Sequence, residues 1–114
     1  MLFKNEFGND FDLGFNLNDY PYLKDKSWHN DVSPSFYFNI GSQYYLLWID
    51  HADPADREDS NSRYLIQEAI NEGTEIHPEI YSSDGRVIFE SEHFMELEVF
   101  LPCLLAKPSK VIRS

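Results

Sequence analysis

Cysteine is nearly absent from this chain of 114 residues. Its one cysteine, Cys103, cannot form a disulfide within the chain. It lies in the apolar run 101–106, where a lone cysteine is typical of a small core residue rather than a nucleophile. The sequence also has no apolar stretch near the ~20 residues that span a bilayer, and it does not begin with the apolar segment of a signal peptide. We therefore expect a cytoplasmic protein with no membrane association.

Glycines and clustered metal ligands are scarce as well. The five glycines form neither a phosphate-binding loop nor a dinucleotide fingerprint, and no serine lies in a Gly-x-Ser-x-Gly turn. Zinc sites need closely spaced histidines and cysteines, but the histidines are scattered, at His29, His51, His77 and His93. We predict no catalytic residue, no metal site and no cofactor, and we interpret the histidines as ordinary surface or hydrogen-bonded residues.

Basic residues are outnumbered by acidic ones, nine to twenty, which gives a formal net charge of −11. Residues 27–106 contain three bases and fifteen acids and so carry −12, whereas residues 1–26 carry −2 and residues 107–114 carry +3. A field of this sign repels nucleic-acid phosphates and attracts basic proteins. We expect no nucleic-acid partner and take a basic protein as the candidate partner. The alternative is that the charge serves only solubility.

Aromatic residues, in contrast, are abundant, at 16% of the chain. The length and composition predict one folded domain. Aromatic and branched residues dominate segments 35–40 and 43–50, and Gly41 with Ser42 between them predicts a tight hairpin. Because the second segment is almost uniformly apolar, we predict a central strand that is covered on both faces.

Further strands are predicted after this hairpin. Residues 63–70 are assigned to a strand, with a helix that stops at Gly73 as the alternative. A hairpin loop at 71–73 then leads into a strand at 74–82, which Pro78 places at the edge of the sheet. After a turn, residues 86–90 form the next strand.

The C-terminal part of the chain predicts a helix. Ser91 can cap it and Glu92 suits its first turn. Its apolar face is formed by Phe94, Leu97, Leu101, Leu104 and Leu105. The alternatives are an alternating strand at 95–99 and an early end at Pro102.

Together these elements predict an α+β fold, in which a four- or five-stranded, mainly antiparallel sheet carries a C-terminal helix on one face. Residues 27–106 form the core of the single domain 1–114. Residues 1–26 are predicted to be an irregular arm on this core that can include one edge strand, because apolar residues alternate between 11 and 17. Residues 107–114 are expected to be a frayed basic tail.

The sharpest change along the sequence comes at Asp50, where the apolar strand gives way to an acidic segment, residues 50–59. Pro54 and the many aspartates exclude a strand here and allow a short helical turn that starts near Asp53. The segment lacks the alternating ligands, central glycine and distal glutamate of a calcium loop. We therefore interpret it as a docking surface, whose carboxylates steer a basic partner and whose neighbouring tryptophan anchors it. The candidate partner-binding residues are Trp48, Asp50, Asp53, Asp56, Glu58 and Asp59.

Three stretches within residues 28–58, about a quarter of the chain, carry a resemblance to known proteins. They are Trp28-His29-Asn30-Asp31 leading into Ser33-Pro34-Ser35-Phe36, Leu47-Trp48-Ile49-Asp50, and Asp53-Pro54-Ala55-Asp56-Arg57-Glu58. In these stretches the chain resembles small acidic proteins carried on mobile elements, such as integron gene-cassette products and immunity proteins. The resemblance implies a class in which binding is commoner than catalysis.

The leading hypothesis is therefore a non-enzymatic acidic binding module of the immunity or inhibitor type. One alternative is a small-molecule-binding protein or enzyme, with an aromatic pocket between sheet and helix. Another is a homo-oligomer, such as a homodimer, that associates through an aromatic sheet face or a sheet edge.

Overall fold

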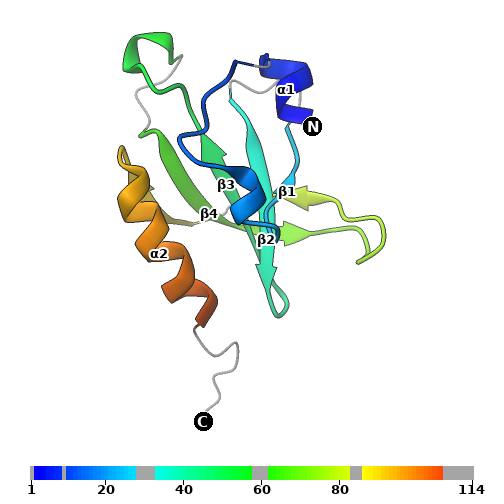
Figure 1. The fold of residues 1–114 in the computed structure, drawn as a ribbon. Coiled ribbons are helices and arrows are strands. Elements are labelled where there is room, and N and C mark those ends of the chain that lie inside the picture. The colour runs from blue at the N-terminus through cyan, green and yellow to red at the C-terminus, as the bar shows by residue number, and fades with distance from the viewer. Residues whose placement is uncertain (1, 9, 28–32, 58–61, 83–85, 107–114) are drawn as a thin grey trace.

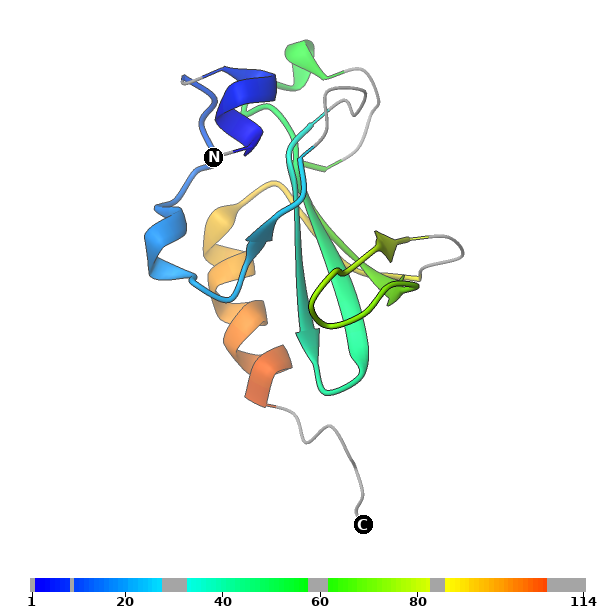
Figure 2. The ribbon, with the colours of Figure 1, turned by 90° about the vertical axis from the view of Figure 1, so that its right-hand side faces the viewer.

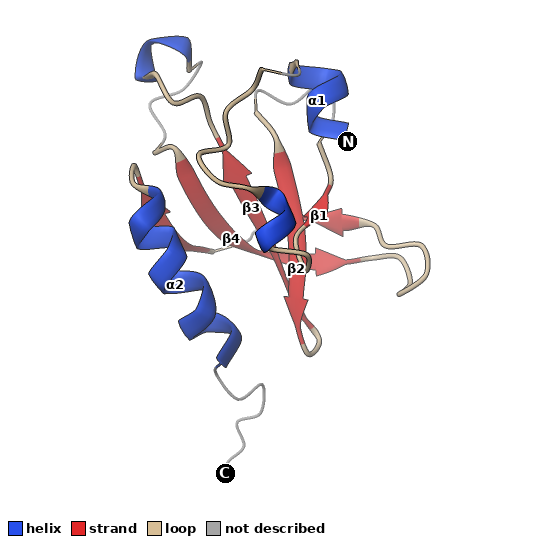
Figure 3. Cartoon of the chain, in the orientation of Figure 1, coloured by secondary structure: helices blue, strands red, loops and turns tan. Residues whose placement is uncertain are grey.

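The computed structural model describes residues 2–8, 10–27, 33–57, 62–82 and 86–106. It shows a six-stranded antiparallel sheet with a C-terminal helix on one face, which confirms the predicted α+β fold (Figures 1 and 3). The elements, in chain order, are α1 (Leu2–Phe7), the 3-10 helix η1 (Leu17–Asp19), β1 (Lys24–Asp25), β2 (Ser35–Ile40), β3 (Gln43–Ile49), the 3-10 helix η2 (Pro54–Asp56), β4 (Tyr64–Asn71), β5 (Ile80–Tyr81), β6 (Val87–Ser91) and α2 (Phe94–Ala106).

The hairpin of β2 and β3 is the centre of the sheet, as the sequence predicted. Ile40 pairs with Gln43 across the turn, and Gly41 adopts a φ of 60°, which a glycine tolerates without strain. In β3, Leu47 faces the helix and is fully buried, whereas Leu46 on the opposite face is 2% exposed. Both faces of β3 are therefore covered, and its almost uniformly apolar sequence is explained.

β4 is a strand, and the helical alternative for residues 63–70 is wrong. It pairs with β3 along six residues, from Ile49 opposite Tyr64 to Tyr44 opposite Ala69. Side chains alternate as in any strand: Tyr64 and Ile66 join the core on the helix side, and Ala69 joins a smaller cluster on the other face.

The predicted strand at 74–82 is wrong over most of its length, because only Ile80 and Tyr81 pair with β4. Residues 72–79 instead form a loop that Asn71 organises with its side chain. The Oδ1 atom of Asn71 accepts hydrogen bonds from the backbone N–H groups of Gly73 and Glu79, both at 2.9 Å. A side chain that bonds the backbone in this way competes with regular strand pairing.

β5 and β6 occupy the same edge of β4. The backbone N–H of Glu68 donates to the carbonyl of Arg86, next to β6. The backbone N–H of Glu72 donates to the carbonyl of Glu79, next to β5, and both bonds measure 2.8 Å. Because backbone N–H groups alternate in direction along a strand, groups four residues apart point the same way. β5 and β6 are thus two parts of one interrupted strand.

Helix α2 begins two residues later than the Ser91 cap predicted. Ser91 ends β6, and its hydroxyl accepts a hydrogen bond from the N–H of His93 at 3.0 Å and donates to Glu96. The competing strand at 95–99 is excluded, and Leu97, Leu101 and Leu104 are buried against the sheet.

Two residues of α2 behave differently from the sequence prediction. Pro102 neither ends the helix nor enters the core; it is exposed, so water can reach the carbonyl of Glu98 that a residue with an N–H would have bonded. Cys103 is also exposed, and its assignment as a core residue is wrong. The next residue, Leu104, is on the buried face. An uninterrupted apolar run does not show which of its residues face the core.

The N-terminal arm packs on the same sheet face as α2 (Figure 2). Residues 10–16 do not form the edge strand that their alternation allowed; the edge strand is β1, which pairs with β2. The alternation instead describes burial, since the apolar side chains at 11, 13, 15 and 17 contact the core while residues 12, 14 and 16 between them are exposed.

Two hydrogen bonds hold the arm, one partly buried and one buried. The N–H of Phe3 donates to the Asp25 carboxylate at 2.9 Å, and the hydroxyl of the fully buried Tyr64 donates to the carbonyl of Leu13 at 2.7 Å. The tail predicted at 107–114 lies outside the described residues. Among the helices that are described, none has the length and apolar character needed to span a membrane.

Candidate functional site

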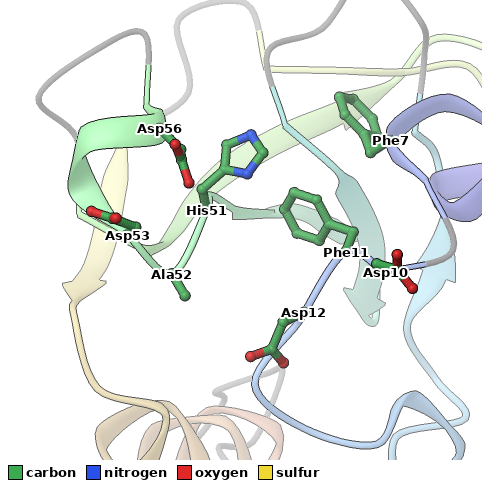
Figure 4. Close-up of a pocket in the computed structure, with 8 residues that line it drawn as sticks. All are labelled: Phe7, Asp10, Phe11, Asp12, His51, Ala52, Asp53 and Asp56. Atoms are coloured by element: carbon green, nitrogen blue, oxygen red, sulfur yellow. The ribbon is translucent and has the colours of Figure 1, made fainter.

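An acidic cleft lies between the N-terminal arm and the loop that follows β3 (Figure 4). Its volume is about 360 Å³. The arm and the loop each contribute two aspartates, and the rings of two phenylalanines and a histidine line the cleft between them (Figure 4). The residues that line the acidic cleft are Phe7, Asp10, Phe11, Asp12, His51, Ala52, Asp53 and Asp56.

The loop wall owes its shape to a capped 3-10 turn, close to the helical turn that the sequence predicted. Asp53 is the N-cap of η2, and its Oδ1 atom accepts a hydrogen bond from the N–H of Ala55 at 2.9 Å. Pro54 suits the first position of the turn because its missing N–H is not needed there. Asp53 and Asp56 are consequently held on the exposed side of this loop.

Arg57, the arginine of the acidic segment, points into the protein rather than into the acidic cleft. Only 3% of its side chain is exposed, and its guanidinium makes a two-pronged ion pair with Glu92 at 2.8 and 3.0 Å. It also donates to the carbonyls of His51 at 2.8 Å and Ala52 at 3.3 Å. Arg57 therefore fixes the loop onto the turn between β6 and α2.

This ion pair changes the acidity of both partners. The hydrogen bond from Arg57 lowers the pKa of Glu92, and a further hydrogen bond from the N–H of Arg63, at 3.0 Å, acts in the same direction. The same hydrogen bond raises the pKa of Arg57, although burial acts in the opposite direction. Both groups are charged at neutral pH, and their charges are satisfied within the protein.

The arm wall is ordered by local hydrogen bonds and aromatic packing. The Asp12 carboxylate accepts the N–H of Gly14 at 2.8 Å and lies 3.6 Å from the guanidinium of Arg63. The Phe11 ring lies 4.9 Å from the His51 imidazole and 6.0 Å from Phe7, measured between centroids. The floor of the acidic cleft is therefore aromatic, and Asp12 at its edge is paired with the guanidinium of Arg63.

The structure places the predicted partner-binding residues in different surroundings. Asp53 and Asp56 line the acidic cleft. Asp50 is 5% exposed and accepts the N–H of His51. Trp48 lies on the sheet face opposite the helix, where its indole donates to Gln67 at 2.8 Å. Glu58 and Asp59 lie outside the described residues.

Sequence reasoning missed the half of the acidic cleft that the arm supplies. Asp10 and Asp12 flank Phe11, and this alternation signals that the two carboxylates share an exposed side while the ring is directed inward. The pattern does not reveal that His51 packs against that ring, because the two residues are forty positions apart.

The acidic cleft is better suited to binding a cation than to catalysing a reaction. Within the described residues, no group of three or more His, Cys, Asp or Glu side chains is placed to hold a metal ion. What the acidic cleft offers is an aromatic surface bordered by aspartates. Such a surface suits a cation with an apolar stem, as in lysine or arginine, because the stem packs on the rings and the charge reaches the carboxylates.

A second cleft of about 370 Å³ lies outside the space between sheet and helix. It is lined by Tyr22, Lys24, Tyr37, Asn39, Tyr44, Glu75 and Pro78. Between the sheet and the helix, Leu47, Leu97 and Leu101 have no exposed surface.

Comparison with known proteins finds no matching family model, no similar curated protein and no similar solved structure.

Proposed function

We propose that this protein is a non-enzymatic binding module whose acidic cleft receives a lysine or arginine side chain of a basic protein partner. The observation that carries the proposal is the position of four aspartates around an aromatic floor, two from the arm and two from the loop. An immunity or inhibitor role is consistent with it, because carboxylates can pair with lysines and arginines on a target protein.

Two properties of the acidic cleft support a cationic ligand. The guanidinium of Arg57 is directed into its pair with Glu92, while the exposed Asp53 and Asp56 line the acidic cleft. The Phe7 and Phe11 rings then provide the faces on which a guanidinium or ammonium group gains an additional electrostatic attraction. The net charge of −11 extends this attraction beyond the cleft and accelerates the encounter with a basic partner.

The test measures binding of an arginine-rich peptide by calorimetry, first to the wild type and then to a protein carrying Asp10→Asn and Asp56→Asn. Both residues are exposed, and both line the acidic cleft. Each exposed charge pair contributes about 0.2–1 kcal/mol, so we expect the double variant to bind between about two-fold and thirty-fold more weakly.

The matched control carries Glu72→Gln and Glu79→Gln, which remove the same charge from exposed positions in the loop before β5. We expect the control to bind within about two-fold of the wild type at 0.15 M salt, because screening suppresses distant charges. Equal weakening by both double variants would show that only net charge matters and would refute the role of the acidic cleft.

The second cleft supports an alternative function, the binding of a small molecule. Three tyrosines, an asparagine amide and two charged side chains converge there, which is the mixture of ring faces and polar groups typical of ligand sites. A screen of neutral polar compounds by NMR would test it. Shifts at Tyr44 that a Tyr37→Ala variant abolishes would favour this function, and a screen without specific shifts would count against it.

A further inference from the structure

The second cleft has one basic and one acidic side chain in its wall, those of Lys24 and Glu75. Lys24 belongs to β1, the first strand in the order of the sheet, whereas Glu75 belongs to the loop between β4 and β5, at the other end of that order. Both residues are exposed, and no ion pair in the described part of the structure includes either of them. The second cleft therefore presents a cation and an anion that do not pair with each other.

Two tyrosines of the central hairpin lie between these charged residues in the strand order. Lys24 is opposite Tyr37 on β2, and Asn39, two residues further along β2, is opposite Tyr44 on β3. The Tyr37 and Tyr44 rings are 6.5 Å apart, measured between centroids, and both residues are half-buried. Neither hydroxyl takes part in a hydrogen bond within the described ranges. The rings thus offer apolar faces, and their hydroxyls can donate or accept a hydrogen bond from a ligand.

These groups define the chemistry of a ligand for the second cleft. The tyrosine rings suit an apolar body, Lys24 suits a carboxylate, and Glu75 suits an ammonium group. The volume of about 370 Å³ is near the lower end of ligand pockets, which span roughly 300–1,000 Å³, so the ligand should be small. The acidic cleft differs in its selectivity, because its four aspartates favour a ligand with a net positive charge.

We propose that the second cleft binds a small zwitterion with an apolar side chain, a free amino acid or a dipeptide, whose carboxylate meets Lys24 and whose ammonium group meets Glu75. This inference rests on the second cleft being a ligand site, as in the alternative function above, and it does not depend on the acidic cleft. The two kinds of ligand differ in the separation of their charges, since each residue of an extended chain adds about 3.5 Å. A ligand this small should bind with a dissociation constant on the order of millimolar.

NMR titration tests the ligand class, with phenylalanine and alanyl-phenylalanine as probes. The signals of Tyr44 are followed, so that a cation bound in the acidic cleft is not counted. We expect at least one probe to shift these signals, and the tighter of the two identifies the ligand as an amino acid or a dipeptide. The N-acetylated form of that probe lacks the ammonium group, and its amide lacks the carboxylate. Each blocked form should bind about two-fold to five-fold more weakly, because it loses one exposed charge pair.

Variants of the two charged residues show which residue meets which charge of the probe. In Lys24→Met, amidation of the probe should no longer weaken binding, because its carboxylate has already lost its partner. In Glu75→Gln, acetylation of the probe should likewise have no effect. The matched controls are Lys26→Met and Glu79→Gln, which remove the same charges from residues that are near in sequence but do not line the second cleft. Both controls should discriminate between free and blocked probes as the wild type does.

The possible outcomes separate this inference from the function on which it rests. If neutral polar compounds shift the Tyr44 signals and neither zwitterionic probe does, the second cleft binds another class of small molecule and the inference is overturned. If no compound of either kind shifts them, the inference and the alternative function are both overturned. The inference is also overturned if the blocked probes bind as tightly as the free ones, or if Lys24→Met and Glu75→Gln discriminate no differently from their controls.

Discussion

The ion pair between Arg57 and Glu92 is the interaction whose removal we expect to affect the acidic loop most. Replacing Arg57 by Met keeps a long apolar side chain but removes the ion pair and both hydrogen bonds to loop carbonyls. Arg57 has 3% of its side chain exposed, so few water molecules can take its place, whereas Glu92 is 45% exposed and becomes hydrated once it is released.

The magnitude follows from these exposures. Each of the two carbonyl hydrogen bonds contributes about 1 kcal/mol. Removing one partner of a fully buried pair costs about 3–5 kcal/mol, because the other charge is left buried. Solvent can reach Glu92, so we expect the loss of this ion pair to cost about 1 kcal/mol. We expect Arg57→Met to lower the free energy of unfolding by about 3 kcal/mol and the melting temperature by about 10 °C.

The assay is urea unfolding at pH 7, followed by tryptophan fluorescence and circular dichroism. A double-mutant cycle with Glu92→Gln should give a coupling energy of about 1 kcal/mol. The control is Arg86→Met, because the Arg86 side chain is 76% exposed in its 3.2 Å pair with Glu68 and should contribute less than about 0.5 kcal/mol. If Arg57→Met were no more destabilising than Arg86→Met, the reasoning from burial would be refuted.

Two further predictions concern pH and glycine. Because the pKa of Glu92 is lower in the folded than in the unfolded protein, its contribution to the free energy of unfolding should be complete above its ordinary pKa near 4.5 and be lost as the pH falls through the folded value. The stability difference between wild type and Arg57→Met should therefore shrink below pH 4.5. A difference that grew there would contradict this reasoning. Gly14→Ala should destabilise the protein by about 2–3 kcal/mol, because Gly14 has a φ of 88° and an added methyl group would overlap the Tyr64 hydroxyl. Gly8→Ala, at a φ of 99° with open space around it, should cost only about 1 kcal/mol. Thermal unfolding compares the two variants, and equal losses of stability would exclude the steric effect.

The sequence predicted the elements whose pattern is local. The hairpin at Gly41 needed only two apolar runs and a turn, and the buried face of α2 follows from the spacing of Leu97, Leu101 and Leu104. The prediction of a strand rather than a helix for residues 63–70 was correct, because the loop that follows β4 brings the chain back along it.

The failures concern contacts between distant residues. Nothing near Pro78 indicates that the side chain of Asn71 would close a loop in place of a strand. The inward turn of Arg57 depends on Glu92, thirty-five residues away, and the arm wall of the acidic cleft depends on the packing of Phe11 against His51. The acidic loop was recognisable as a surface, but the cleft that it forms was not.

The origin of the acidic cleft in two separate segments links ligand binding to the stability of the arm. The cleft exists only while Phe7 and residues 10–12 lie against residues 51–56, a placement held by the bonds of Phe3 to Asp25 and of Tyr64 to Leu13. A ligand that binds both walls must therefore favour the docked arm by the same free energy with which the docked arm favours the ligand. Protection from hydrogen exchange at the amides of α1 and residues 10–16 should therefore rise as ligand occupies the acidic cleft. Exchange in the N-terminal arm thus measures ligand binding.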